Sequence, residues 1–407
     1  MHVNSRWGVL AAFSLVAAAT QMVWLTFAPV TTVATERYGV SQAAIGWLAN
    51  VFVLAFVVLA VPAGFLLDRH LRGALILGAV LTAAGACLRL GGDSFTWMMA
   101  GGVMASLGGP IVLTGIVGLS RSYLRPEHRP VGIAAATACT WAGFVVAFLL
   151  PVFFSTVGSL PSLIAVHAGF TMVAAVALVV ALRRPAPFEG AARARRAGLR
   201  DVVTTWRSPV IRKLCLFTFV PFGIFVALTT WTQALLEPQG VSVGEVGVMV
   251  IACVLAGVVG SAVIPVLAAK RGTQIRICLM GIVAAVVACA ALGVAPGFAV
   301  GQVGLTVAGL ALLPMMAIVL ELVEQHSEGG DGIASGLVWT LGNLGGLVVS
   351  TVVGFTLDST LVSYLLMGAV GLLALPVLAG VRAPVAAIAA VRPGDGPGDE
   401  AVVGGRS

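Results

Sequence analysis

The stretch PAGFLLDRHLR, residues 62–72, follows a long apolar run and indicates the fold of the whole chain. No charged residue occurs between Ser41 and Ala60, and four ionisable groups then arrive together: Asp68, Arg69, His70 and Arg72. About 20 apolar residues are enough for a helix to cross the hydrocarbon core of a bilayer. The stretch therefore predicts a short charged loop between two membrane-spanning helices.

The composition supports a membrane protein throughout. The chain has 407 residues, of which 59% are hydrophobic and only 10% are charged, whereas soluble domains carry about 25% charged residues. Backbone polar groups inside a bilayer must bond within their own segment, so the spans are helices. The sequence predicts an all-α membrane protein.

Twelve apolar runs are predicted to span the membrane. The first is too long for a signal peptide, and the boundary at Ala295–Pro296 is not marked by charge. The predicted spans cover residues 7–34, 43–67, 72–91, 97–119, 130–154, 161–182, 211–235, 243–268, 274–294, 297–319, 332–356 and 360–381.

The basic residues predict the orientation. With twelve spans and the N-terminus inside, all but Arg37 and Arg89 of the 23 lysine and arginine residues fall on the cytoplasmic side. Such a bias places both termini in the cytoplasm, and we expect a bacterial inner (plasma) membrane. The net charge of +7 is explained in this way, so no nucleic-acid partner is expected. Arg89 is expected to reach the headgroups or to pair with Asp93.

The chain divides at a basic segment, residues 183–213. The expected organisation is an N-terminal six-helix half (1–182), a cytoplasmic linker (183–213), a C-terminal six-helix half (214–385) and a disordered cytoplasmic tail (386–407). Within the linker, Leu199 to Trp206 form either an amphipathic helix on the membrane surface or part of a plain basic connection.

The charged loop has the pattern Gly64-x-x-x-Asp68-Arg69-x-x-Arg72, which resembles the loop after the second span in the major facilitator superfamily. The resemblance implies two six-helix halves that move against each other, with this loop as a latch. Gly64 allows helices to approach closely, and Asp68 can accept hydrogen bonds from the N-terminus of a facing helix. Ordinary positive-inside charge is the alternative, but it explains only the two arginines.

A narrower resemblance is to the feline-leukaemia-virus-receptor-related transporters, a branch associated with choline, ethanolamine and haem. It rests on WLTFAPVTTVATERYGVSQAAIGWLANVFVLAFVVLAVPAGFLLDRHLR (24–72), GFVVAFLLP (143–151) and VEQHSEGGDGIASGL (323–337). In that family a tryptophan of span one stacks on a quaternary ammonium, and Trp24 matches it. A tyrosine of span seven matches Val226, beside Phe225. Two glutamines match Trp141 and Asn343, which departs from the family pattern.

The predicted substrate-binding residues stand out without the family as well. Tryptophans are usually enriched at the membrane interfaces, yet several lie in mid-span here. Indoles and amides around one pocket suit a cationic or amphipathic organic molecule through cation–π contact and burial. Packing between helices is the alternative for each lone tryptophan. The predicted residues are Gln21, Trp24, Trp141, Phe225, Trp339 and Asn343.

Two acids, Glu321 and Glu324, lie near the cytoplasmic end of the tenth span. Each is either a gate or coupling group or a solvated acid at a helix end. The six cysteines show no CxxC or Cys/His spacing, so no metal or cofactor is expected. The sequence shows no nucleophile–base set, so an enzyme is not expected.

These patterns predict a secondary-active or facilitative transporter of a small organic solute, monomeric in the bilayer and working by alternating access. One alternative keeps the fold but exports hydrophobic drugs or a secondary metabolite. The other is a membrane enzyme or sensor that shares only the fold.

Overall fold

The computed structural model describes residues 4–154, 156–188, 199–327 and 330–378, and these residues contain helices and no strand. Most helices have the length that an apolar span requires. The long helices are α1 (Trp7–Leu25), α3 (Gln42–Leu88), α4 (Phe95–Thr114), α6 (Arg129–Leu149), α7 (Leu160–Leu182), α9 (Pro209–Leu236), α10 (Val243–Arg271), α11 (Gln274–Val294), α12 (Phe298–His326) and α13 (Asp331–Gly354). The shorter ones are α2 (Thr31–Tyr38), α5 (Ile116–Tyr123), α8 (Leu199–Arg207) and α14 (Thr360–Ala374), with 3-10 turns η1 (Ala28–Val30), η2 (Pro126–His128), η3 (Leu150–Phe153) and η5 (Glu237–Gln239).

Ten helical stretches among the described residues are long and apolar enough to cross a membrane. The count differs from the twelve predicted spans for two reasons. Helix α3 counts once, although its 47 residues are interrupted by a non-helical backbone at His70 (φ −145°, ψ 63°). Helix α14 has 15 residues, which rise about 22 Å at 1.5 Å each, less than the hydrocarbon thickness. The predicted charged loop is thus a kink within α3.

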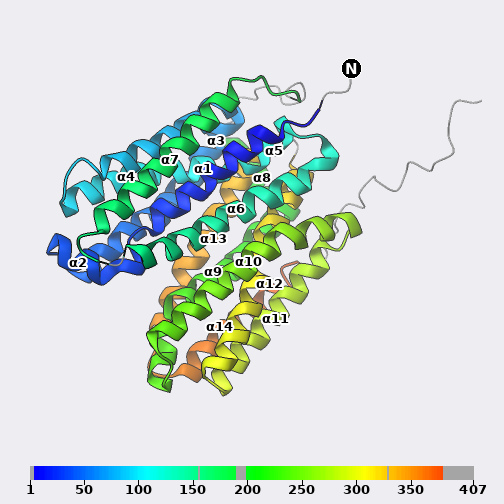
Figure 1. Ribbon diagram of the computed structural model, residues 1–407. Coiled ribbons are helices and arrows are strands. Elements are labelled where there is room, and N and C mark those ends of the chain that lie inside the picture. Colours follow the sequence, from blue (N-terminus) through cyan, green and yellow to red (C-terminus); the bar gives the residue numbers. More distant parts are fainter. Residues whose placement is uncertain (1–3, 155, 189–198, 328–329, 379–407) are drawn as a thin grey trace, which may run out of the picture.

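The helices form two groups in space. Figure 1 shows α1 to α7 gathered on one side and α9 to α12 with α14 on the other. Helix α13 runs between them and packs on α9, so we count it with the second group. Inside the first group α3 packs on α4 and α1 packs on α6, and inside the second α10 packs on α12 and α9 on α13. The two groups meet where α3 packs on α13 and where α6 packs on α10.

Small residues allow the close contact of α3 with α13. A Cβ added to Gly64 would lie 2.6 Å from the carbonyl carbon of Gly332, and one added to Gly336 would lie 2.9 Å from the carbonyl carbon of Ala60. No real side chain tolerates such distances from a backbone. Glycine at these positions therefore lets the two backbones touch, as it does in other packed membrane helices.

The first predicted span, residues 7–34, is not one helix. Helix α1 ends at Leu25, and the chain continues through η1 into α2. Pro29 lies in η1 and has no N–H to offer to a helical hydrogen bond, so it favours the interruption. The predicted boundary near Ala295–Pro296 is confirmed, because α11 ends at Val294 and α12 begins at Phe298.

The linker contains a helix, α8, which contacts α9 and α13. Residues 199–207 of the linker are therefore helical, and the position of this helix on the membrane surface stays a prediction. Residues 189–198 and the predicted disordered tail, 386–407, lie outside the described residues.

Two ends of the molecule differ in charge. We call the end that carries Asp68, Arg121, Arg129 and α8 the basic end. At the opposite end, Arg37 donates to both carboxylate oxygens of Asp93, at 2.8 and 2.6 Å. The expected pairing of Arg89 with Asp93 is wrong, because Arg37 occupies that carboxylate.

Candidate functional site

Aromatic side chains from both groups form one cluster. In the first group, the ring of Trp24 lies 5.5 Å from Phe144, which lies 5.4 Å from Trp141. In the second group, Phe225 and Phe222 lie 5.9 and 6.2 Å from Trp141. These centroid separations are those of favourable edge-to-face and offset ring pairs. Trp141 thus joins the two groups through ring contacts.

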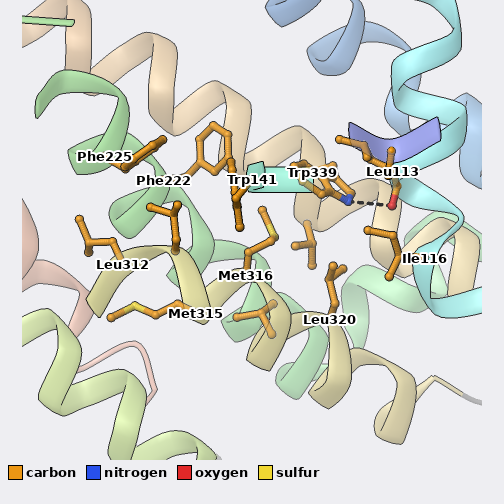
Figure 2. Close-up of a cluster of buried hydrophobic side chains, with 14 of the residues drawn as sticks. Leu113, Ile116, Trp141, Phe222, Phe225, Leu312, Met315, Met316, Leu320 and Trp339 are labelled. Carbon is orange, nitrogen blue, oxygen red and sulfur yellow. Dashed lines mark hydrogen bonds between the residues drawn. The ribbon is translucent and has the colours of Figure 1, made fainter. Parts of the chain in front are cut away.

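The cluster continues on α13 and α3. Trp339 lies 6.4 Å from Phe222 and 5.6 Å from Phe56, again pairing the second group with the first. We call Trp24, Phe56, Trp141, Phe144, Phe222, Phe225 and Trp339 the aromatic cluster. Figure 2 shows Trp141, Phe222 and Trp339 lying side by side above the methionines of α12.

Four of the six predicted substrate-binding residues belong to this cluster: Trp24, Trp141, Phe225 and Trp339. Sequence reasoning missed Phe222 and Phe144, although each lies three residues from a predicted one. Residues three apart share a helix face, and this rule would have found both. Phe56 carried no signal in the sequence, because phenylalanine is common in apolar spans.

The two predicted amides bond locally. The Gln21 side chain donates to Thr20 Oγ1 at 3.0 Å, and the Asn343 side chain donates to the Trp339 carbonyl at 2.9 Å. Both are buried. The indole N–H groups of Trp24 and Trp339 donate to the carbonyls of Ala49 and Leu113, at 3.0 and 3.2 Å. These bonds orient the two indoles, and the amides of Gln21 and Asn343 are committed to their own helices.

A cavity adjoins Trp141 on the side of the second group. It is lined by Trp141, Thr218, Pro221, Phe222, Phe225, Leu312, Leu313, Met315, Met316 and Val319, and its volume is about 20 Å³. That volume holds about one water molecule. The indole nitrogen of Trp141 is buried and has no hydrogen-bond partner within the described residues. In this conformation the predicted pocket is filled by its own aromatic and methionine side chains.

Asp68 joins the two groups at the basic end. Its Oδ1 accepts a hydrogen bond from the Gly332 N–H at 2.7 Å, and its Oδ2 accepts one from the Ile333 N–H at 3.1 Å. Both donors lie in the first turn of α13, where N–H groups have no partner inside the helix. The positive end of the helix dipole further favours a carboxylate there.

The arginines predicted to share the latch do not behave alike. Arg69 is exposed, and Arg72 is half-buried. Two other arginines, missed in the sequence, make the ion pairs between the groups. Arg121 Nε lies 3.3 Å and Arg129 Nη1 lies 3.0 Å from Glu324 Oε1.

Arg121 makes further contacts with the second group. Its Nη1 lies 2.8 Å from Asp331 Oδ1, and it also donates to the carbonyls of Glu324 and Ser327. The same guanidinium therefore holds the end of α12 and the start of α13. Positive-inside charge alone would have predicted these arginines as cytoplasmic, but their partners depend on the packing of α5 and α6 against α12.

Glu321 lies apart from this network. It is buried, and its Oε1 accepts hydrogen bonds from the side chains of Gln274 and Gln325, at 3.1 and 2.8 Å. The two predicted acids thus have different surroundings: Glu324 faces arginines of the first group, and Glu321 bonds to amides of the second.

The described residues contain no group of three or more histidine, cysteine, aspartate or glutamate side chains placed to hold a metal ion. The site consists of the aromatic cluster with its cavity and the polar network at the basic end.

Comparison with known proteins bears on what such a site does. The family model of the Major Facilitator Superfamily matches residues 10–350. The protein named solute carrier family 49 member A3 from Danio rerio is 26% identical over 359 residues, which cover 83% of this chain and 76% of the relative. The choline/ethanolamine transporter FLVCR1 of Mus musculus is 31% identical over 150 residues, 36% of this chain but only 27% of the relative. Both relatives are animal proteins and lend no support to a bacterial membrane.

Solved structures show the same fold. The human organic anion transporter MFSD10 superposes with a TM-score of 0.77 at 16% identity, covering 91% of this chain and 99% of that chain. The Escherichia coli transporter FucP, in its outward conformation, superposes with a TM-score of 0.75 at 14% identity, covering 91% and 98%. At these identities the likeness concerns the fold alone.

Proposed function

The chain belongs to the Major Facilitator Superfamily, and we propose that it carries a small organic solute across a membrane by alternating access. Membership makes it an integral membrane transporter and not an enzyme. The two helix groups are the proposed moving bodies, residues 1–182 and 214–385, joined by the linker 183–213. Each acts as a unit, and the chain works as a monomer.

The proposed topology has twelve crossings. Helix α3 supplies two of them because its backbone breaks at His70, and α14 supplies the last. The basic end faces the cytoplasm, since lysine and arginine concentrate on that side of membrane proteins. Both termini are then cytoplasmic.

The proposed substrate is an organic cation or an amphipathic molecule. The observation that carries this proposal is the aromatic cluster, which draws rings from both groups to one place beside the cavity at Trp141. Aromatic faces attract ammonium groups, most strongly when water is excluded. The relative FLVCR1 is named for choline and ethanolamine, which are molecules of this class.

The proposed cycle depends on breaking the contacts at the basic end. Asp68, Arg121 and Arg129 hold the two groups together there. Separation of the groups at this end would part Trp141 from Phe222 and Phe225, because these rings pair across the boundary. The small cavity would then widen to the size of an organic solute and open to the cytoplasm.

One observation favours the alternative of an exporter of hydrophobic compounds. The side chains around the cavity are apolar apart from Thr218 and the indole nitrogen of Trp141, and none is charged. A cavity of this kind binds neutral hydrophobic molecules by burial alone. The two proposals differ in whether positive charge on the ligand improves binding.

Ligand binding to the purified protein separates them. We would measure the thermal unfolding of the protein with choline, ethanolamine and the neutral isostere 3,3-dimethylbutanol, followed by uptake of the best ligand into proteoliposomes. A larger stabilisation by choline than by its isostere supports the cation, and the reverse order supports the hydrophobic exporter. Stabilisation by neither, with no uptake of choline or ethanolamine and no efflux of hydrophobic dyes, would exclude both.

Trp24→Ala tests the location of the site, and Trp231→Ala is its matched control. Both tryptophans are half-buried and donate to a backbone carbonyl, but Trp231 makes no ring contact among the described residues. Loss of ligand stabilisation in Trp24→Ala alone supports a site at the aromatic cluster. Equal behaviour of the two variants contradicts it.

A further inference from the structure

An arginine lies buried inside the first helix group, far from the ion pairs at the basic end. Arg89, at the end of α3, is 3% exposed. Its Nη1 donates to the Val23 carbonyl at 2.8 Å and lies 3.4 Å from Thr26 Oγ1. Its Nε and Nη2 are buried and have no hydrogen-bond partner within the described residues.

The charge of Arg89 is not balanced by a carboxylate. It forms no ion pair in the described part of the chain, and the neighbouring acid Asp93 is bonded through both oxygens to Arg37. The C-terminal end of α1 and the ring of Phe27, 5.4 Å away, offset part of the charge. Neither supplies the counter-charge that a buried ion requires.

Two other polar groups near Arg89 also have a buried atom without a hydrogen-bond partner among the described residues. His167 pairs through Nδ1 with Thr26 Oγ1 at 2.8 Å, and its Nε2 is buried without a partner among the described residues. The Tyr38 hydroxyl is likewise buried without one. Both groups lie near Arg89: His167 shares Thr26 Oγ1 with it, and the Tyr38 ring packs 6.3 Å from Phe27, the ring that Arg89 contacts. Of these atoms, Nε and Nη2 of Arg89 are donors, and unpaired buried donors indicate a small polar acceptor that the chain itself does not supply.

There is room for such a species beside Arg89. Gly101 and Gly102 of α4 face the arginine side chain. Outside the backbone of its own helix and its two chain neighbours, a Cβ built on Gly102 would have a single heavy atom within 4 Å, Nη2 of Arg89 at 3.1 Å. Gly102 is itself buried, so the open space lies inside the protein and next to the unpaired nitrogen.

We propose that this space is a binding site for a small inorganic anion, chloride, held by Nε and Nη2 of Arg89. A water molecule could accept the same hydrogen bonds, but it would leave the buried charge uncompensated. The site adjoins the last turn of α1, which carries both Val23 and Trp24. By neutralising Arg89, the bound anion would stabilise the arginine that donates to the Val23 carbonyl, one residue before Trp24.

The test is the thermal unfolding of the purified full chain as chloride replaces gluconate at constant ionic strength. A thiol-reactive dye reports unfolding, since Cys215, Cys253, Cys278 and Cys289 are buried in the folded protein. A ligand that binds only the folded state raises the unfolding temperature in a saturable manner. We expect such saturation with chloride and with bromide, and its loss in Arg89→Gln.

Arg37→Gln is the matched control, because it removes an arginine at the same end that is already paired. It should retain the saturable chloride response. A wild-type protein without that response, or an Arg89→Gln variant that keeps the same response, would overturn the proposal and leave water as the partner of Arg89.

A second variant decides the matter if Arg89→Gln does not fold. Gly102→Ala leaves the arginine in place but puts a methyl group 3.1 Å from Nη2, in the proposed site. The chloride concentration at half-saturation should rise. An unchanged value would show that the space beside Nη2 is not where the anion binds.

Discussion

Replacement of Asp68 by asparagine should open the basic end of the protein. The asparagine oxygen can still accept from the Gly332 N–H, but its NH2 group would face the Ile333 N–H, and two donors do not bond. The variant loses one charge-assisted hydrogen bond, which contributes about 1.5–3 kcal/mol. It also loses the attraction of a carboxylate to the N-terminus of α13, a further 0.3–1 kcal/mol or so.

Asp68 is only partly buried, so the lower part of the combined range applies. A loss of about 2 kcal/mol changes the ratio of open to closed basic ends by roughly 30-fold. Such a change converts a minor open state into a readily detected one.

The assay is a distance measurement between spin labels on the two helix groups. Glu127 and Arg271 are exposed and belong to different groups, so labels there report separation. The native cysteines would be replaced first. The wild-type protein should give mainly the short distance, and Asp68→Asn should add a longer one.

Asp93→Asn is the control for Asp68→Asn, because it removes a carboxylate from the opposite end of the same group. It should leave the distance between the labels unchanged. If Asp68→Asn gives the wild-type distance distribution in the same preparation, the latch argument is refuted.

Three other changes have expected outcomes. Gly64→Val places side-chain atoms against the backbone of Gly332. The variant should therefore lengthen the same spin-label distance as Asp68→Asn does. An unaltered distance would mean that α3 and α13 do not need this close contact. Arg121→Gln removes two partly buried ion pairs. It should shift the same equilibrium by about 2 kcal/mol, between the values for exposed and for fully buried pairs, because the arginine is partly exposed. Spin-label populations measure this, and a shift in the opposite direction would contradict it. Trp24→Ala should abolish transport at normal expression, as measured by uptake into proteoliposomes, and wild-type kinetics would remove Trp24 from the substrate path.

The helices of the membrane region could be predicted well from the sequence, because a bilayer leaves few alternatives to an apolar helix. The predictions of local backbone structure were wrong at two places. The predicted loop at Asp68–Arg72 is a kink in α3, and the first span ends at Leu25, where Pro29 and the bonds from Thr26 and Arg89 to the last carbonyls of α1 interrupt it.

The aromatic cluster of the candidate site could be predicted in part, because tryptophans in the middle of a span stand out. Mid-span tryptophans such as Trp141 are unusual in position, and the structure brings them together. The ion pairs of Arg121 and Arg129 could not be predicted in the same way. Many arginines are available at the basic end, and which of them meets Glu324 depends on how two distant helices pack.

The polar network at the basic end recognises main-chain atoms as well as side chains. Arg121 donates to the carbonyls of Glu324 and Ser327 near the end of α12, while Asp68 accepts from the N–H groups of Gly332 and Ile333 in α13. Every amino acid except proline offers these atoms. Random mutagenesis should therefore tolerate replacements at position 327, which the network contacts through its carbonyl, provided that the chain keeps its path, whereas positions 68 and 121 should resist change. Over evolutionary time, residues that give the network only main-chain atoms can diverge while Asp68 and Arg121 stay the same.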